Sequence, residues 1–132
     1  MAKKSTKQWF EREEFWNNFG PIMFDAQRWA EAPDVAEAVK KICGLKKGSS
    51  ILDAGCGPGR ISLELAKLDL KVTGVDLIQS ELDAAEESAQ DEGAAGQILS
   101  AKSSLAEIMQ RLQTTVRHSI SIILPAIFSA EL

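Results

Sequence analysis

The stretch ILDAGCGPGR at residues 51–60 decides the fold expected for this chain. It opens with the apolar residues of a short strand, passes through an aspartate, and enters a turn with three glycines in five positions. Residues 61–68 then carry apolar side chains at helical spacing, and residues 70–75 have the apolar, β-branched character of a second strand that ends at Asp76. Such a βαβ unit predicts an α/β fold with a parallel sheet.

Further elements flank this unit on both sides. They are expected as helices at residues 34–43, 80–92 and 103–112, and as strands at residues 97–101 and 116–124. The first of these helices is expected to bury a face made of Val35, Ala38, Val39 and Ile42. The second is expected to begin in a capping box of Ser80 and Asp83. The count gives a sheet of about four strands.

Composition sets limits on the class of protein. The 132 residues suit one domain, and 45% hydrophobic with 26% charged residues is ordinary for a globular chain. A net charge of −4 argues against binding of nucleic acid through an overall positive charge. Two cysteines and one histidine give neither a disulfide framework nor a metal cluster. No apolar run reaches the ~20 residues of a membrane span, so a cytoplasmic protein is expected.

The glycine turn and the acid after it are typical of nucleotide binding. Glycines let a ligand approach the backbone, and an acid at the end of the second strand can hold ribose hydroxyls. Asp76 follows Gly55 by 21 residues, close to the spacing of about 20 expected for these roles. The dinucleotide pattern G-x-G-x-x-G fails, because Arg60 stands where its last glycine belongs. Asp53 would also repel a pyrophosphate and suits a ligand with a positive amino group.

Residues 51–60 together with Val72-Thr73-Gly74-Val75-Asp76 resemble the class I S-adenosylmethionine-dependent methyltransferases. The resemblance implies a cofactor whose methionine part lies over the glycine turn, with Asp53 near its ammonium group. It implies that Asp76 holds the ribose and that Leu77 flanks the adenine. The cofactor-binding residues expected on this basis are Asp53, Gly55, Cys56, Gly57, Gly59, Asp76 and Leu77. No catalytic residue is identified, and no metal is expected.

The resemblance also implies a division of the chain. Residues 1–32, which hold all three tryptophans, would form a helical, aromatic-rich extension that folds over the cofactor. Its expected lid residues are Phe19, Phe24 and Trp29, with Arg28 near the cofactor carboxylate. Residues 33–96 would be the cofactor-binding half of a Rossmann-like, doubly wound sheet. Residues 97–132, with only two acids and an apolar end, form an atypical last segment.

A complete domain of this family has seven strands, and this sequence has room for about four. Three interpretations stay open: a truncated methyltransferase, a half-domain completed as a homodimer through residues 97–132, and a non-catalytic cofactor-binding or dimerising module. An NAD-dependent oxidoreductase is disfavoured by Arg60. The expected partner is a small-molecule acceptor rather than nucleic acid or membrane. Cys56 is interpreted as a small buried residue of the turn and not as a nucleophile.

Overall fold

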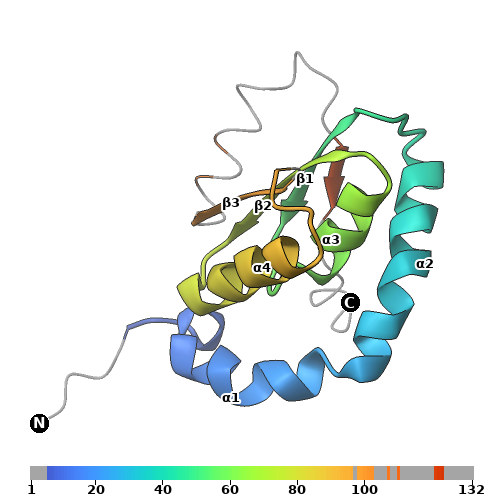
Figure 1. The fold of residues 1–132 in the computed structure, drawn as a ribbon. Coiled ribbons are helices and arrows are strands. Elements are labelled where there is room, and N and C mark those ends of the chain that lie inside the picture. Colours follow the sequence, from blue (N-terminus) through green and yellow to red (C-terminus); the bar gives the residue numbers. More distant parts are fainter. Residues whose placement is uncertain (1–5, 97, 103–106, 108–109, 111–120, 124–132) are drawn as a thin grey trace, which may run out of the picture.

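The computed structural model describes residues 6–96, 98–102, 107, 110 and 121–123. Its sheet is parallel and has the order β3-β2-β1-β4, as Figure 1 shows. The strands are β1 (Ser50–Ala54), β2 (Lys71–Asp76), β3 (Ile98–Lys102) and β4 (Ser121–Ile123). In register, Asp53 of β1 lies opposite Gly74 of β2 on one side and Ile123 of β4 on the other. The expected parallel sheet of four strands is confirmed.

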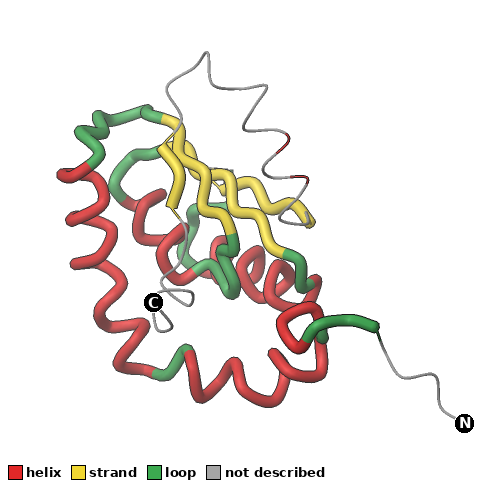
Figure 2. The backbone as a smooth tube through the Cα atoms, turned by 180° about the vertical axis from the view of Figure 1, so that it is seen from behind, coloured by secondary structure: helices red, strands yellow, loops and turns green. Residues whose placement is uncertain are grey.

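The helices lie along the sheet and around its edge (Figure 2). They are the 3-10 helix η1 (Trp9–Glu11) and the α-helices α1 (Glu13–Met23), α2 (Ala26–Ile42), α3 (Arg60–Lys67) and α4 (Gln79–Asp91). Helix α3 connects β1 to β2, and α4 connects β2 to β3. The aromatic first zone is therefore helical, as expected. Among the described helices, none is both long and apolar enough to cross a membrane.

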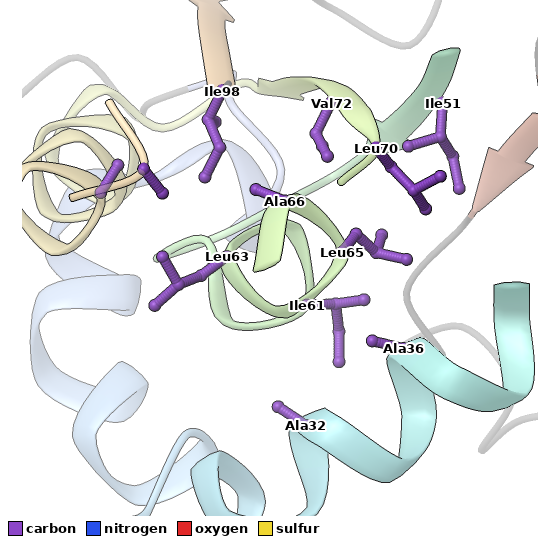
Figure 3. Close-up of a cluster of buried hydrophobic side chains, with 12 residues drawn as sticks. Ala32, Ala36, Ile51, Ile61, Leu63, Leu65, Ala66, Leu70, Val72 and Ile98 are labelled. Atoms are coloured by element: carbon purple, nitrogen blue, oxygen red, sulfur yellow. The ribbon is translucent and has the colours of Figure 1, made fainter. Parts of the chain in front are cut away.

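The main core lies between the sheet and α2, with α3 in the middle (Figure 3). Its largest fully buried members include Ile51 and Val72 from the strands and Leu65 from α3. Ala32 and Ala36 of α2 point at α3 and are completely buried. Two methyl groups one turn apart let the helices approach closely, because neither side chain keeps the backbones apart. This packing fixes α3, and with it the turn that precedes α3.

The buried face expected for the helix at residues 34–43 is confirmed only at Val39, which packs against the main core, and is wrong at the other three residues. Helix α2 starts earlier, at Ala26, where the Asp25 side chain accepts a hydrogen bond from the Arg28 amide at 2.9 Å. Its buried face passes through the two alanines, whereas Val35 is 39% exposed and Ile42 is 83% exposed. Ala38 is exposed as well, so the expected face is displaced around the helix, and the main contact is made by Ala32 and Ala36.

The expected capping box at the start of α4 is also wrong. Helix α4 begins at Gln79, and the residue before it, Ile78, offers no side-chain cap. The Glu13 carboxylate of α1 instead accepts the amide of Gln79 at 3.0 Å and that of Ser80 at 3.4 Å. An acid distant in sequence thus satisfies the first amides of the helix. Most of the expected helix at residues 103–112 and most of the expected strand at 116–124 lie outside the described residues.

Candidate functional site

The candidate site lies where β1 and β2 end, at the turn formed by residues 55–59. Its three glycines have positive φ angles: 79° at Gly55, 55° at Gly57 and 81° at Gly59. Side chains rarely adopt this conformation, which explains why the turn is built of glycine. The turn also lies beside the point where the sheet reverses its strand order, between β1 and β4. Ligands of open α/β sheets bind at such switch points.

The amides of this turn are all bonded within the protein. Gly55 and Cys56 both donate to the Val75 carbonyl, at 2.7 and 3.0 Å. Gly57 donates to Oδ2 of Asp76 at 2.8 Å, and Gly59 donates to the Cys56 carbonyl at 3.1 Å. The remaining member, Pro58, has no amide hydrogen. These residues therefore present no free donor of the kind that cradles phosphate groups.

Asp76 joins the turn to the start of α4. One carboxylate oxygen accepts the Gly57 amide, and the other accepts the Ile78 amide at 2.9 Å. The side chain is half-buried. Each carboxylate oxygen has a second lone pair that these two bonds leave free. Asp76 is therefore held in one orientation and retains two acceptor positions for hydroxyl groups.

Asp53 is the most deeply buried acid of the site, with 1% exposure. Its Oδ2 accepts the Ser62 hydroxyl at 2.6 Å, and its Oδ1 is buried without a partner in the described structure. Burial raises the pKa of Asp53 to about 6, against the lowering effect of the Ser62 hydrogen bond, and the charge of Asp76 raises it further. Near neutral pH the site thus holds a buried, largely ionised carboxylate with one oxygen to spare.

Cys56 is buried in the turn, as expected. Its Sγ lies 2.9 Å from the place where a Cβ on Gly74 would stand, so that glycine makes room for the thiol. Burial raises the pKa of Cys56 far above its usual range, and the charges of Asp53 and Asp76 add to this effect. The thiol therefore stays neutral and has no nucleophilic character near pH 7.

A cavity of about 290 Å³ lies between the N-terminal helices, the turn and α4. Three aromatic side chains line it: Trp16 of α1, Phe24 and Trp29. The other lining residues are Asn17, Gly20, Pro21, Pro58, Ser80, Glu81 and Ala84. The two expected lid residues Phe24 and Trp29 thus come together beside the turn. Phe19 does not line the cavity; it is 49% exposed and stacks on Phe15.

Glu81 supplies the negative charge of this cavity. A Cβ on Gly20 would lie 3.4 Å from its Oε1, and a Cβ on Gly57 would lie 3.6 Å from its Oε2. The carboxylate is therefore held between two glycines, one in α1 and one in the turn. Burial raises the pKa of Glu81 to about 7, and the charges of Asp76 and Glu13 raise it further.

The structure thus gathers most of the expected residues around one end of the sheet. Leu77 is partly buried in the loop before α4. The Arg28 side chain is exposed, while its carbonyl accepts Nη1 of Arg60 at 2.8 Å. Sequence reasoning missed Trp16, Ser62 and Glu81. Their position in the first turns of α1, α3 and α4 was the available signal, since the first turns of α3 and α4 follow strands that end at the site.

The described residues contain no group of three or more histidine, cysteine or acidic side chains that could hold a metal ion. The site is instead a set of acids around a glycine turn at the carboxyl end of a parallel sheet. These features define the class as a Rossmann-like α/β domain. Comparison with known proteins agrees with this class and narrows it.

A family model described as a methyltransferase domain matches residues 45–117, more than half of the chain. The chain therefore belongs to this family of methyltransferase domains. An S-adenosyl-L-methionine-dependent Diels-Alderase of Talaromyces variabilis is 52% identical over 46 residues, which are 35% of this chain and 16% of that protein. A ubiquinone biosynthesis O-methyltransferase of Nitrosococcus oceani is 48% identical over 46 residues, 35% of this chain and 20% of that protein. The match spans at most a fifth of these relatives.

Solved structures give the same fold. A candidate S-adenosyl-L-methionine-dependent methyltransferase from Methanococcus maripaludis superimposes with a TM-score of 0.61 and 20% identity, covering 79% of this chain and 46% of that one. The cyclase SpnF superimposes with a TM-score of 0.51 and 23% identity, covering 55% of this chain and 27% of that one. The sheet of this chain is thus an incomplete, Rossmann-like version of the fold seen in these proteins.

Proposed function

We propose that this chain binds S-adenosylmethionine over the glycine turn and serves methyl transfer to a small-molecule acceptor. The carrying observation is the electrostatic character of the turn. Its amides are bonded internally, and the carboxylates of Asp53, Asp76 and Glu81 surround it. A site of this kind repels a pyrophosphate and attracts a ligand with positive charge. S-adenosylmethionine carries two positive groups, an ammonium and a sulfonium.

The residues present fit this cofactor group by group. The unpartnered Oδ1 of Asp53 would accept a hydrogen bond from the ammonium group, which would also balance the buried charge. The two oxygens of Asp76 would accept the ribose hydroxyls through their remaining lone pairs. Leu77 would lie against the adenine. Gly55, Cys56, Gly57 and Gly59 would form the floor of the site, and their backbone would lie against the methionine part.

When bound, the cofactor supplies an electrophilic methyl group on its sulfonium. The chain's own contribution is then positioning and exclusion of water, which the aromatic residues at the N-terminal helices favour. No residue is proposed as a catalytic base. The proposal takes residues 1–32 as the lid, residues 33–96 as the cofactor-binding part and residues 97–132 as a separate last segment. A cytoplasmic location remains a prediction from the sequence.

A non-catalytic cofactor-binding module is the second candidate. One relative is named as an S-adenosyl-L-methionine-dependent Diels-Alderase, so a matching segment also occurs in a protein named for another reaction. The chain also covers less than half of the solved methyltransferase-like structure that it resembles. Turnover separates the two candidates: transfer of a labelled methyl group to any of a broad set of acceptors supports the first. Cofactor binding without turnover on any of them supports the second.

The test of cofactor binding is a calorimetric titration of the chain with S-adenosylhomocysteine. Asp76→Ala should weaken binding by about ten- to a hundredfold, since a hydrogen bond to a charged group contributes ~1.5–3 kcal/mol. Asp83→Ala, which changes an exposed acid of α4 away from the turn, is the matched control and should leave the affinity unchanged. The same titration with NADH should show no binding.

Three results would contradict the proposal. If the folded chain does not bind S-adenosylhomocysteine, the proposed cofactor site is refuted, even though the chain belongs to the family. Equal affinity in wild type and Asp76→Ala removes the ribose assignment. Tighter binding of NADH than of S-adenosylhomocysteine would return the oxidoreductase interpretation, in spite of Arg60.

A further inference from the structure

Aromatic side chains form much of the wall of the cavity beside the glycine turn. Trp16 and Phe24 lie nearly parallel, with ring centroids 6.5 Å apart and planes inclined by 18°. The Trp16 indole nitrogen donates to the Phe10 carbonyl at 2.8 Å, which fixes the orientation of the ring. Trp29 packs against the main core and forms another part of the wall. At about 290 Å³, the space is near the lower end of known ligand pockets, roughly 300–1,000 Å³.

One carboxylate completes these walls. Glu81 lines the cavity, and its Oε2 is buried without a hydrogen-bond partner in the described structure. The charged groups that act on it from neighbouring elements are Asp76 at the end of β2 and Glu13 of α1, and both are acids. The cavity lining contains no lysine or arginine. An acid held in this way lacks a positive partner, and the cavity has space for one.

Aromatic faces and a carboxylate attract the same kind of ligand. The faces of tryptophan and phenylalanine rings are electronegative and bind organic cations, most strongly where water is excluded. The Glu81 carboxylate, when ionised, adds a negative charge at short range. A neutral apolar ligand would leave Glu81 without a partner, and an anion would be repelled. Charge complementarity therefore selects an organic cation as the occupant.

We propose that this cavity is the acceptor-recognition subsite and that it binds a positively charged alkylammonium group of the acceptor between Trp16, Phe24 and Glu81. The acceptor role rests on the proposed methyltransferase function, and the cation preference rests on the cavity alone. Recognition of the ammonium group positions the acceptor, and the methylated atom is a separate part of it.

Choline and its neutral carbon counterpart, 3,3-dimethylbutan-1-ol, have nearly the same shape and differ in charge. Titration of the full chain with each, followed by tryptophan fluorescence, should show choline binding at least tenfold more tightly. Glu81→Gln should reduce choline affinity about tenfold and leave the alcohol unaffected. Glu87→Gln changes an exposed acid two turns along the same helix and should alter neither.

The pH dependence gives a second measurement on the unmodified chain. With a pKa of about 7 for Glu81, choline should bind more tightly as the pH rises from 6 to 8, because the carboxylate ionises. Binding of the neutral alcohol should not change over this range. The ionisation of Glu81 is opposed by Asp76 and Glu13, which face it from β2 and α1. The pH dependence of choline binding tests the proposal even if the Glu81→Gln variant does not fold.

Equal affinity for choline and the alcohol would overturn the proposal, as would choline binding that is unchanged in Glu81→Gln or across pH 6–8. The titration is repeated with saturating S-adenosylhomocysteine. Simultaneous binding supports a separate acceptor subsite, whereas mutual displacement assigns the cavity to the cofactor and overturns the subsite. If the chain binds choline but not S-adenosylhomocysteine, the cation site is supported and the methyltransferase role is refuted. Failure of the cation site can therefore be distinguished from failure of the proposed function.

Discussion

Asp53 lies out of water at the end of β1, with one oxygen on the Ser62 hydroxyl and the other without a partner. Its ionised form loses hydration that a single hydrogen bond does not replace, so the charge opposes folding. A leucine or valine at this position would add to the core instead. Acids of this kind occur where a ligand uses them, and their effect on stability is a measurable sign of that use.

The free energy of unfolding of Asp53→Asn should therefore depend on pH relative to that of the wild type. The folded pKa of Asp53, about 6, lies above the ordinary aspartate value of 3.8, so the contribution of Asp53 to stability is present below pH 3.8 and is lost as the pH rises through 6. As the pH rises from 4 to 8, the free energy of unfolding of the variant should increase by about 2–3 kcal/mol relative to that of the wild type. Urea unfolding at the two pH values measures this gain.

The unpaired amide group introduced by Asp53→Asn has its own cost, but that cost does not change with pH. The difference between the two pH values therefore isolates the ionisation of Asp53. If the difference in the free energy of unfolding between variant and wild type is the same at pH 4 and pH 8, ionisation of Asp53 does not destabilise the fold. Asp91→Asn, an exposed acid at the end of α4, supplies the background pH effect.

At the scale of the elements, Gly59 sets the distance between the turn and α4. A Cβ there would lie 2.9 Å from the Cβ of Ala85, and φ is 81°. Gly59→Ala should lower the free energy of unfolding by about 2–5 kcal/mol, as the sum of the positive φ and the overpacking. Gly93→Ala, where φ is 70° and the space is open, should cost only about 1–2 kcal/mol. Equal losses in chemical unfolding would contradict this close approach.

Glu13 connects α1 to the start of α4. The Ser80 hydroxyl and the amides of Gln79 and Ser80 lower its pKa, so the carboxylate stabilises the fold above about pH 4.5 and ceases to do so as the pH falls through the lowered pKa. Glu13→Gln should cost about 0.5–1 kcal/mol, a modest value because the side chain is exposed. Amide hydrogen exchange at Gln79 and Ser80 should accelerate.

Glu14→Gln is the matched control for this contact, since it alters the neighbouring acid in the first turn of α1. It should leave exchange at Gln79 and Ser80 as it is in the wild type. If Glu13→Gln also leaves that exchange unchanged, the carboxylate does not cap α4.

The elements that were predictable are those whose signal is local. The strands at the site and the glycine turn follow from apolar runs and from glycines at fixed spacing, and the structure places β2 within a residue of the strand expected at residues 70–75. The buried face of α2 was not predictable in this way, because alanine carries little hydrophobic signal and gains its role from contact with α3. Glu81 and Trp16 lie in the first turns of their helices, but the cavity itself is formed by the approach of α1 to α4, which no local pattern indicates.

At the scale of the whole molecule, β4 lies at the edge of the described sheet, with β1 on its one paired side. An unpaired strand edge can add a strand from a second chain. A homodimer formed in this way, through residues 97–132, is one of the three interpretations that the sequence leaves open. Light scattering should then give twice the 14.4 kDa of a single chain. A mass of 14.4 kDa at the concentrations used for cofactor titration would refute the dimer and leave the cofactor proposal intact.

The internal hydrogen bonds of the glycine turn have a thermodynamic consequence. A loop that waits for its ligand to become ordered loses backbone freedom on binding, about 1–2 kcal/mol for each residue that is fixed. Here Val75, Asp76 and Cys56 already hold the backbone of residues 55–59 in its final shape. The entropy of ordering this turn is lost during folding, before any ligand arrives. Because the turn is already ordered, a ligand that binds there keeps more of the free energy of its contacts as affinity.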